Sequence, residues 1–324
     1  MSADGRRHRL AGLEPDNLLA FLALLGLLRA LEKAEPAWLP KVAWTVDAPP
    51  VRPELSLSVA VSHEKIAATA ADGVAFLAER HDFGALKDLR LSPEDAAEQL
   101  AAARASGDVY TADLWAALVS DAAVRERNKA EEAEPTPLCL MFGQGHQHFL
   151  ERLRSVPRMA RADRGFSRSK AVISAEDCMA EALFTPWARP DAMPSFRWDP
   201  HEDVRYALRA TDPTTQSTKE TTQHGANRLA AVGLAALTVV PERRAGKARL
   251  GMLGGGRDAG GAFTFTWPIW RRPIGLTAIR ALLGHPGLDD ADTRRALGVV
   301  DRQRARRISV GRFMNITRAV SLDA

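Results

Sequence analysis

The chain has 324 residues, of which 46% are hydrophobic and 26% are charged, an ordinary composition for a globular protein with one large core or two domains. Its two cysteines, Cys139 and Cys178, belong to no CxxC motif, which argues against a disulfide framework or a cysteine-rich zinc site and favours a reducing, cytoplasmic compartment. The apolar run from Leu18 to Leu31 is shorter than the roughly 20 residues of a membrane span, so we expect a core helix, without a signal peptide or membrane anchor.

The net charge of +4 conceals two parts of opposite sign. Residues 1–150 carry 15 Lys or Arg against 22 Asp or Glu, and residues 151–324 carry 29 against 18. This asymmetry favours contact between the second part and a polyanion, above all nucleic acid. The alternative is that the arginines reflect a GC-rich coding sequence, in which arginine and alanine are common, and bind no polyanion.

The beginning of the chain predicts a central helix and a short hairpin. Asp16 and Asn17 are typical residues for a helix start, and the helix should continue to about residue 34 with apolar residues on nearly every face. Gly26 within it would let another backbone approach closely. A short strand is expected at residues 10–13, and alternation over residues 41–46 and 55–61 predicts two paired strands.

The next stretch is predicted to be helical. We expect helices over residues 66–79, 92–105 and 111–127, the second with Ser92 as its cap. Residues 131–137 have the composition of an exposed acidic linker. The linker divides an acidic, mostly helical domain (1–135) from a basic α+β domain (136–324) that faces nucleic acid.

The second part mixes the two kinds of element, so the fold class is α+β. The expected helices are 146–154, 175–184, 226–237, 277–283 and 289–307, and the expected strands are 138–142, 238–240, 249–253 and 262–270. The last helix ends in four arginines, namely Arg302, Arg304, Arg306 and Arg307. In the strand 262–270, Pro268 indicates an edge or an end.

Three short motifs each have a functional and a structural interpretation. Gly254–Gly256 could expose amides to a phosphate or simply join two strands, and it lacks the lysine of a P-loop. His146 and His148 could bind a metal or lie at a solvated helix start. Ser167 to Lys170 matches the SxxK pattern of serine acyl enzymes, whose companion Lys-Thr-Gly element is missing.

An acidic cluster after Trp198 also has two interpretations. Asp199, Glu202 and Asp203 could hold Mg²⁺ for phosphodiester chemistry, or form salt bridges with neighbouring arginines. The hydroxyl-rich loop that follows, residues 214–222, has side chains suited to phosphate contacts.

Basic residues in the second part form the predicted binding surface. The segment 151–170 mixes arginines with Phe166, a combination that suits phosphate and base contacts. The residues expected to border one nucleic-acid-binding groove are Arg154, Arg158, Arg161, Arg164, Arg168, Lys170, Arg197, Arg205, Arg209, Asn227 and Arg228. We assign no catalytic residue, metal ligand or cofactor, and expect no small-molecule ligand.

Three segments carry a family resemblance. They are GLEPDNLLAFLALLGLLRAL (12–31), FRWDPHEDVRYALRATDPT with HGANRLAAVGL (within 196–234), and FTFTWPIW (263–270). In this order they resemble proteins encoded with type I CRISPR–Cas systems, particularly the large-subunit-like proteins of the I-G (formerly I-U) group.

The resemblance implies a non-catalytic large-subunit-like or accessory subunit of an RNA-guided interference complex in antiviral defence. Its partners would be guide RNA, target DNA and other CRISPR-associated subunits. Base pairing carries the sequence information in such complexes, so the protein needs mainly shape and charge. A metal-dependent nuclease and a protein-interaction scaffold are the alternatives.

Overall fold

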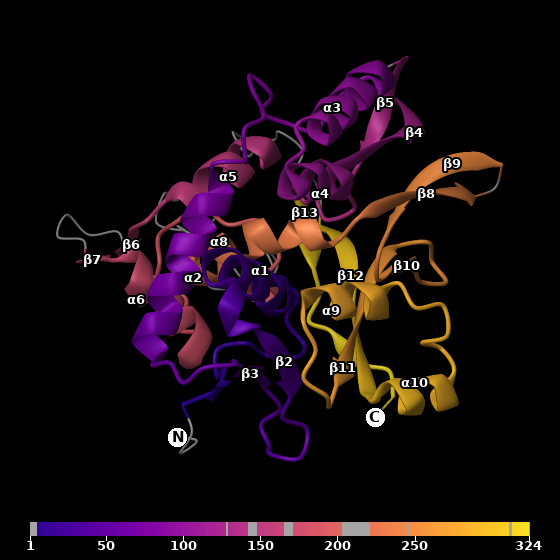
Figure 1. The fold of residues 1–324 in the computed structure, drawn as a ribbon. Helices are drawn as coiled ribbons and strands as arrows, with labels where there is room; N and C mark the ends of the chain where they lie inside the picture. The colour runs from indigo at the N-terminus through magenta and orange to yellow at the C-terminus, as the bar shows by residue number, and fades with distance from the viewer. Residues whose placement is uncertain are drawn as a thin grey trace.

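The computed structural model describes residues 5–127, 129–141, 148–164, 171–202, 221–244, 246–310 and 313–323, and it confirms the α+β class (Figure 1). The helices are α1 (Leu18–Ala34), α2 (His63–Ala78), α3 (Pro93–Ala105), α4 (Val109–Leu118), α5 (Phe149–Ser155), α6 (Ala175–Phe184), α8 (His224–Gly233), α9 (Leu276–Leu283) and α10 (Ala291–Leu297), with 3-10 turns η1 (Pro36–Trp38), η2 (Val156–Arg158), η3 (Pro200–Glu202) and η4 (Leu234–Ala236). The strands are β1 (Arg7–Arg9), β2 (Lys41–Trp44), β3 (Pro53–Ser56), β4 (Val119–Arg127), β5 (Ala130–Pro135), β6 (Ala162–Arg164), β7 (Ala171–Ile173), β8 (Val239–Arg244), β9 (Lys247–Met252), β10 (Gly255–Arg257), β11 (Phe263–Trp270), β12 (Val299–Val310), β13 (Phe313–Ile316) and β14 (Val320–Ser321).

Helix α1 lies at the centre of the molecule, as its apolar pattern predicted. Asn17 caps it by accepting a hydrogen bond from the Ala20 amide at 3.4 Å. Leu18 to Leu28 are all buried, because α2 and α8 cover one side of the helix and β11 covers the other (Figure 1). On the β11 side the Phe21 ring stacks on Trp267, with 5.4 Å between ring centroids.

The predicted hairpin near the N-terminus is confirmed and has a third strand. β2 and β3 pair antiparallel, and β1 pairs with the other edge of β3. The strand expected at residues 10–13 is wrong: the sheet uses Arg7–Arg9, and the side chains of Leu10 and Leu13 are fully buried in the core.

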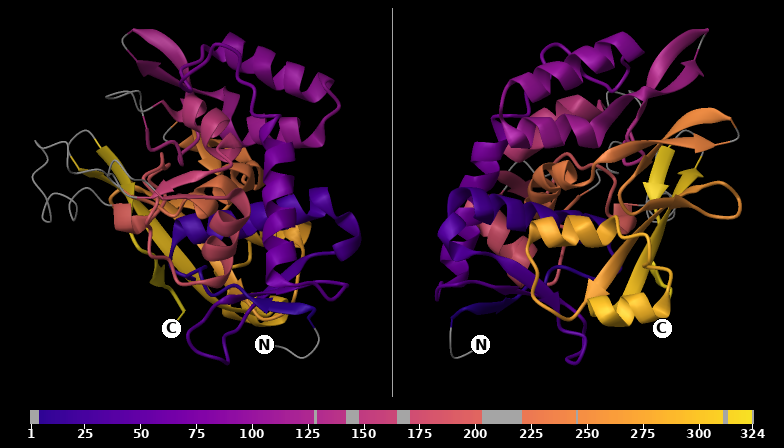
Figure 2. Two further views of the ribbon diagram at one scale, coloured as in Figure 1. Left: turned by 90° about the vertical axis from the view of Figure 1, so that its left-hand side faces the viewer. Right: turned by 45° about the vertical axis from the view of Figure 1, so that its right-hand side comes forward.

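The predicted helix 111–127 and the acidic linker after it are wrong. Helix α4 ends at Leu118, and β4 and β5 form an antiparallel hairpin. Opposite charges pair across the two strands, as between Arg125 and Glu132 at 3.3 Å, so the acidic stretch is a strand of a ribbon. This hairpin lies beside the β8–β9 hairpin (Figure 2), where Glu134 accepts from Arg249 at 2.9 Å.

The largest described sheet lies near the C-terminus. Its strand order is β10-β11-β12-β13, with β14 also pairing with β12, and each pair is antiparallel. On β11, Phe263, Phe265, Trp267 and Ile269 face the core, as predicted. Pro268 pairs with Arg302 of β12 but lies beyond the end of β10, which pairs only with residues 263–265, so β11 is an edge strand at this position.

Two further corrections concern the second part. The helix expected over 289–307 ends at Leu297, because Gly298 takes a left-handed conformation at φ 75° and strand β12 begins at Val299. The run 138–141, expected as a strand, is irregular and buried.

One hydrophobic cluster contains residues from both sides of position 135. It joins α1 and α2 to α8 and the C-terminal sheet. The proposed division into domains 1–135 and 136–324 stays a prediction. Cys139 and Cys178 are free and buried, and none of the described helices is long and apolar enough to span a bilayer.

Candidate nucleic-acid interface

Three of the predicted arginines form hydrogen bonds or ion pairs with other residues of the chain. Arg154 donates to the Gly84 carbonyl at 2.7 Å, and Arg158 donates to the Ala78 carbonyl at the end of α2 at 3.1 Å. Arg164 pairs with Glu181 and with Asp191, and these carboxylates raise its pKa against the opposing effect of burial. Arg161 is exposed.

Three other predicted residues lie inside the protein. Arg197 is 4% exposed, Arg228 is 1% exposed and Asn227 is fully buried. Arg228 donates to the Pro157 carbonyl at 3.2 Å, and burial lowers its pKa. The expectation that these residues border a surface groove is therefore wrong.

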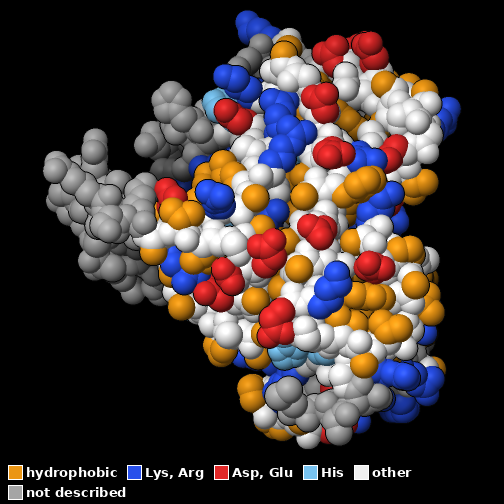
Figure 3. Space-filling model, turned by 60° about the vertical axis from the view of Figure 1, so that its left-hand side comes forward, with side chains coloured by type: hydrophobic (Ala, Val, Ile, Leu, Met, Phe, Trp, Pro, Cys, Tyr) orange, Lys and Arg blue, Asp and Glu red, His pale blue; other side chains and the backbone are white. Residues whose placement is uncertain are grey.

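The other predicted residues, Arg168, Lys170, Arg205 and Arg209, lie outside the described residues. On the face that carries α2 and α6, basic and acidic side chains are interspersed (Figure 3). The described members of the predicted set therefore do not assemble one basic groove.

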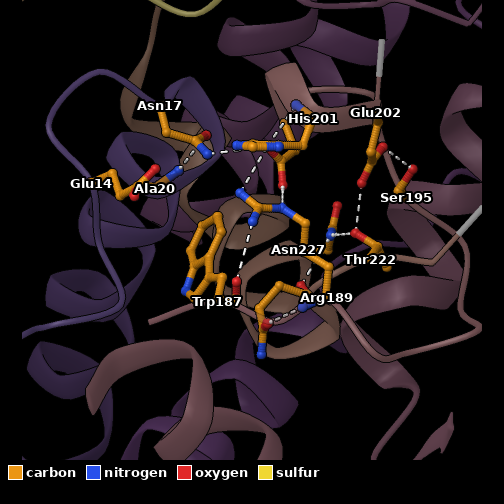
Figure 4. A network of polar contacts seen from close by, with 12 residues as sticks. Glu14, Asn17, Ala20, Trp187, Arg189, Ser195, His201, Glu202, Thr222 and Asn227 are labelled. Carbon is orange, nitrogen blue, oxygen red and sulfur yellow. Dashed lines mark hydrogen bonds and ion pairs between the residues drawn. The ribbon is translucent and has the colours of Figure 1, made fainter. Parts of the chain in front are cut away.

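The acidic cluster belongs to a buried polar network (Figure 4). Asp199 accepts from Arg189 Nε at 2.6 Å and from Asn17 Nδ2 at 3.1 Å. Asn17 also caps α1, so these contacts tie the segment before η3 to the start of the central helix. The partner of Asp199 is thus Arg189, which lies ten residues away and carries no motif that could have revealed it.

Glu202 occupies the other end of this network (Figure 4). Its carboxylate accepts from the hydroxyl of Thr222 at 2.6 Å and from that of Ser195. The Thr222 hydroxyl in turn accepts from Asn227 Nδ2 at 2.8 Å. The two described carboxylates therefore accept from protein donors, Asp199 beside the start of α1 and Glu202 beside α8. Asp203 lies outside the described residues.

The histidine pair is only partly described, since His146 lies outside the described residues. His148 Nδ1 lies 2.9 Å from a carboxylate oxygen of Asp88. In the described ranges, no three His, Cys, Asp or Glu side chains gather as a metal site would require.

A different set of arginines lies on one face of the C-terminal sheet. Residues 302, 304 and 306 of β12 point outward, while Gln303 and Ala305 between them are buried. On β11, Thr266 lies opposite Arg304 and Thr264 lies opposite Arg306. We call this set (Arg302, Arg304, Arg306, Thr264 and Thr266) the β12 arginine face.

The members of this face differ in how they are neutralised. Arg302 is clamped by Asp323, at 2.8 Å from Nε, and by Asp289, and these carboxylates raise its pKa. Arg306 pairs with Asp258 at 2.6 Å. Arg304 is exposed, donates to the Thr266 hydroxyl at 3.2 Å and has no acidic partner in the described chain. Arg304 is therefore the member most available to an external anion.

Two hollows lie along this face. One, of about 260 Å³, lies between the sheet and the loop joining α9 to α10, and Thr266, His285 and Arg304 line it. The other, of about 580 Å³, is lined by Arg306 and Met314. Arg257 lines both, so the hollows are adjacent along β12. Gly254, Gly255 and Gly256 line the first hollow, and the last two belong to β10, which pairs with β11. The phosphate-binding and connecting interpretations of these glycines both stay predictions.

The sequence pattern predicted that these arginines lie at the end of a helix, whereas they lie on strand β12. At about 100° per residue, the middle one would face away from the other two, whereas a strand puts alternate residues on one face. Arg307, next in sequence, points to the other face and donates to the Pro137 carbonyl at 2.9 Å. The alternation of arginine with Gln303 and Ala305 was the signal for a strand.

Comparisons of the chain with protein-family models, with curated protein sequences and with solved structures gave no significant match.

Proposed function

We propose that the chain is a non-catalytic, nucleic-acid-binding subunit of an RNA-guided CRISPR interference complex, and that its β12 arginine face contacts the phosphate backbone of guide RNA or target DNA. The subunit identity follows from the resemblance of the three segments to the type I-G proteins. The binding role rests on the observation that alternate residues of one strand present arginines on a single face.

The arrangement suits a linear polyanion. Alternate residues of a strand are about 6.7 Å apart, so the arginines form a row along which successive phosphates of one strand could lie. Guanidinium groups form charge-assisted, often bidentate hydrogen bonds to phosphate. The Thr266 hydroxyl beside Arg304 is a further phosphate donor. Such contacts give affinity that does not depend on sequence, which suits a complex whose guide supplies the specificity.

The test is binding of single-stranded RNA, single-stranded DNA and duplex DNA to the full chain over a series of salt concentrations. The variant, called the β12 variant, replaces by Gln two members of the β12 arginine face, Arg304 and Arg306, and also Arg257 of the neighbouring β10, which lines both hollows. We expect weaker binding to each ligand the protein recognises, and a slope of log affinity against log salt that falls by about 2 to 3 units.

A matched control removes the same charge elsewhere. Lys65, Arg104 and Lys129 are exposed on α2, α3 and the β4–β5 turn, and their replacement by Gln should leave the salt slope nearly unchanged. Equal effects of the two triple variants would reduce the proposal to a general effect of net charge. Unaltered binding by the β12 variant would remove this face from the interface.

The nuclease and scaffold alternatives have their own readouts. Cleavage of labelled DNA or RNA with Mg²⁺ or Mn²⁺ that is lost on replacing Glu202 would establish the nuclease. RNA that purifies with the chain and is released by high salt supports the binding role, whereas a scaffold would purify without it.

A further inference from the structure

One exposed carboxylate covers an arginine of the β12 arginine face. Asp289 lies in the loop between α9 and α10, and its side chain is 93% exposed although it forms an ion pair with Arg302 Nη1. Among the described residues that line the hollow of about 260 Å³, Asp289 is the one acid. Because so exposed a carboxylate reaches Nη1, an anion from solution can reach the same atom.

The two carboxylates on Arg302 hold it in different ways. Asp323 accepts from Nε at 2.8 Å and from Nη2 at 3.0 Å, is only 11% exposed, and also pairs with Arg294 at 3.0 Å. This largely buried clamp stays closed when a ligand arrives. Asp289 accepts from the third nitrogen of the guanidinium. Nη1 is therefore the atom of Arg302 whose partner can be exchanged without opening the clamp.

The loop that carries Asp289 does not need to move for this exchange. Arg294 holds its backbone by donating to the carbonyls of Leu288 and Asp289, each at 2.9 Å. The Asp289 carboxylate takes no part in these contacts, and an ion pair with so exposed a partner contributes little to stability. A rotation of the Asp289 side chain about its own bonds is therefore enough to uncover Nη1.

Arg304 would hold a phosphate close to this carboxylate. Arg302 and Arg304 are alternate residues of β12, about 6.7 Å apart on one face. Arg304 Nε donates to the Thr266 hydroxyl at 3.2 Å, and its two Nη atoms have no acidic partner in the described chain. A phosphate on these atoms would share the hollow with the Asp289 carboxylate, and like charges repel each other.

We propose that Asp289 competes with the phosphate backbone for Arg302, so that the chain restrains its own binding of nucleic acid. This inference rests on the proposed function of the β12 arginine face. When a strand binds, one of its phosphates accepts from Arg302 Nη1 and from Arg304, and the Asp289 carboxylate turns into water. Phosphate oxygens accept from a guanidinium as carboxylate oxygens do. A strand that contacts several arginines at once can displace the carboxylate, whereas a single free anion is disfavoured.

The experiment measures binding of labelled single-stranded RNA and of duplex DNA to the full chain over a series of salt concentrations. Asp289→Asn is compared with Asp292→Asn, since Asp292 lies three residues away, is 84% exposed and pairs with Arg295. Both substitutions remove one negative charge from the same part of the surface. We expect Asp289→Asn to bind about fivefold more tightly with a salt slope larger by about 1 unit, and Asp292→Asn to change affinity by less than about twofold.

A double variant tests whether Arg302 is the contested group. Arg302→Gln removes the cation for which carboxylate and phosphate compete. Adding Asp289→Asn to Arg302→Gln should therefore change affinity by less than about twofold. The same gain from Asp289→Asn with and without Arg302 would contradict the competition. If Arg302→Gln does not fold, the comparison of the two aspartate variants still decides.

The β12 variant separates failure of this inference from failure of the proposed function. Equal effects of Asp289→Asn and Asp292→Asn, or no gain from Asp289→Asn, overturn the competition. If the β12 variant nevertheless binds more weakly than the parent chain, the proposed function stands. If the β12 variant binds as the parent chain does, both proposals fail.

Discussion

Gly26 of α1 and Gly233 of α8 meet where the two helices cross, and neither position has room for a side chain. A Cβ added at Gly26 would lie 1.8 Å from the Leu229 carbonyl oxygen. One added at Gly233 would lie 2.1 Å from the Leu22 carbonyl oxygen and 2.7 Å from the Gly26 amide nitrogen. The close approach predicted for Gly26 is confirmed, and its partner is a second glycine.

Replacing either glycine by alanine should destabilise the fold. The obstructing atoms belong to helix backbone and cannot rotate away, so we expect Gly26→Ala and Gly233→Ala each to lower the free energy of unfolding by about 3 kcal/mol. Chemical denaturation measures this. Gly260→Ala, where the nearest obstruction is the Asp258 side chain at 3.4 Å, is the control and should change stability by less than about 0.5 kcal/mol.

Two buried histidines should make the protein sensitive to mild acid. Burial lowers the pKa of His81 and of His224 to about 4. Above pH 6.5 both rings are neutral in the folded and in the unfolded chain, so these two groups take nothing from the free energy of unfolding. As the pH falls from 6.5 toward 4, only the unfolded chain takes up these protons, and each histidine removes up to about 3 kcal/mol.

A variant isolates the contribution of His81. Its Nδ1 donates to the Leu153 carbonyl at 2.7 Å, and its Nε2 accepts from the Tyr110 hydroxyl at 2.6 Å. Asparagine keeps a donor near the position of Nδ1 but cannot titrate. Denaturation of His81→Asn between pH 7 and pH 4 should therefore show a shallower loss of stability than the parent chain. An identical pH profile would contradict the assignment.

The stability that the network around Glu202 contributes should depend on the hydroxyl of Thr222. Thr222→Val keeps the shape of the side chain but removes the donor to Glu202 and the acceptor for Asn227. We expect a loss of about 2 kcal/mol in the free energy of unfolding, because buried polar atoms are left unpaired. Thr277→Val, at an exposed position on α9, should be nearly neutral.

Substitutions of Arg302 and Arg304 should differ in effect: the first should lower stability, and the second should leave stability nearly unchanged. Arg302→Gln breaks the clamp with Asp323, so we expect a loss of about 2 kcal/mol in denaturation. Arg304→Gln removes only a hydrogen bond to Thr266, so stability should hold within about 0.5 kcal/mol. If the β12 arginine face binds nucleic acid, Arg304→Gln nevertheless weakens that binding.

The elements that could be predicted from sequence carry their own local signals. Asn17 and Ser92 are cap residues whose side chains accept from amides three residues later, as the pattern requires. The apolar alternation on β11 likewise needs no knowledge of distant residues. The helix expected over 289–307 failed because Gly298 was not taken as a stop, although its φ of 75° suits glycine above all.

The candidate sites depend on contacts between distant residues, so their composition is not visible in any one segment. Arg228 looks like a surface cation in sequence, yet the Pro157 carbonyl accepts from it inside the protein. Arg189 and Asn17 meet on Asp199 across 10 and 182 residues respectively. A count of arginines in one half of the chain predicts net charge and cannot distinguish a cation on the surface from one in the core.

The hydrogen bond from the Trp267 indole to the Pro15 carbonyl joins positions 252 residues apart. During synthesis the leucines of α1 leave the ribosome long before β11 exists to cover them. The side of α1 that packs on β11 must therefore stay uncovered in the nascent chain after α2 and α8 have been made, and chaperone binding at this side of the helix is the expected response of the cell.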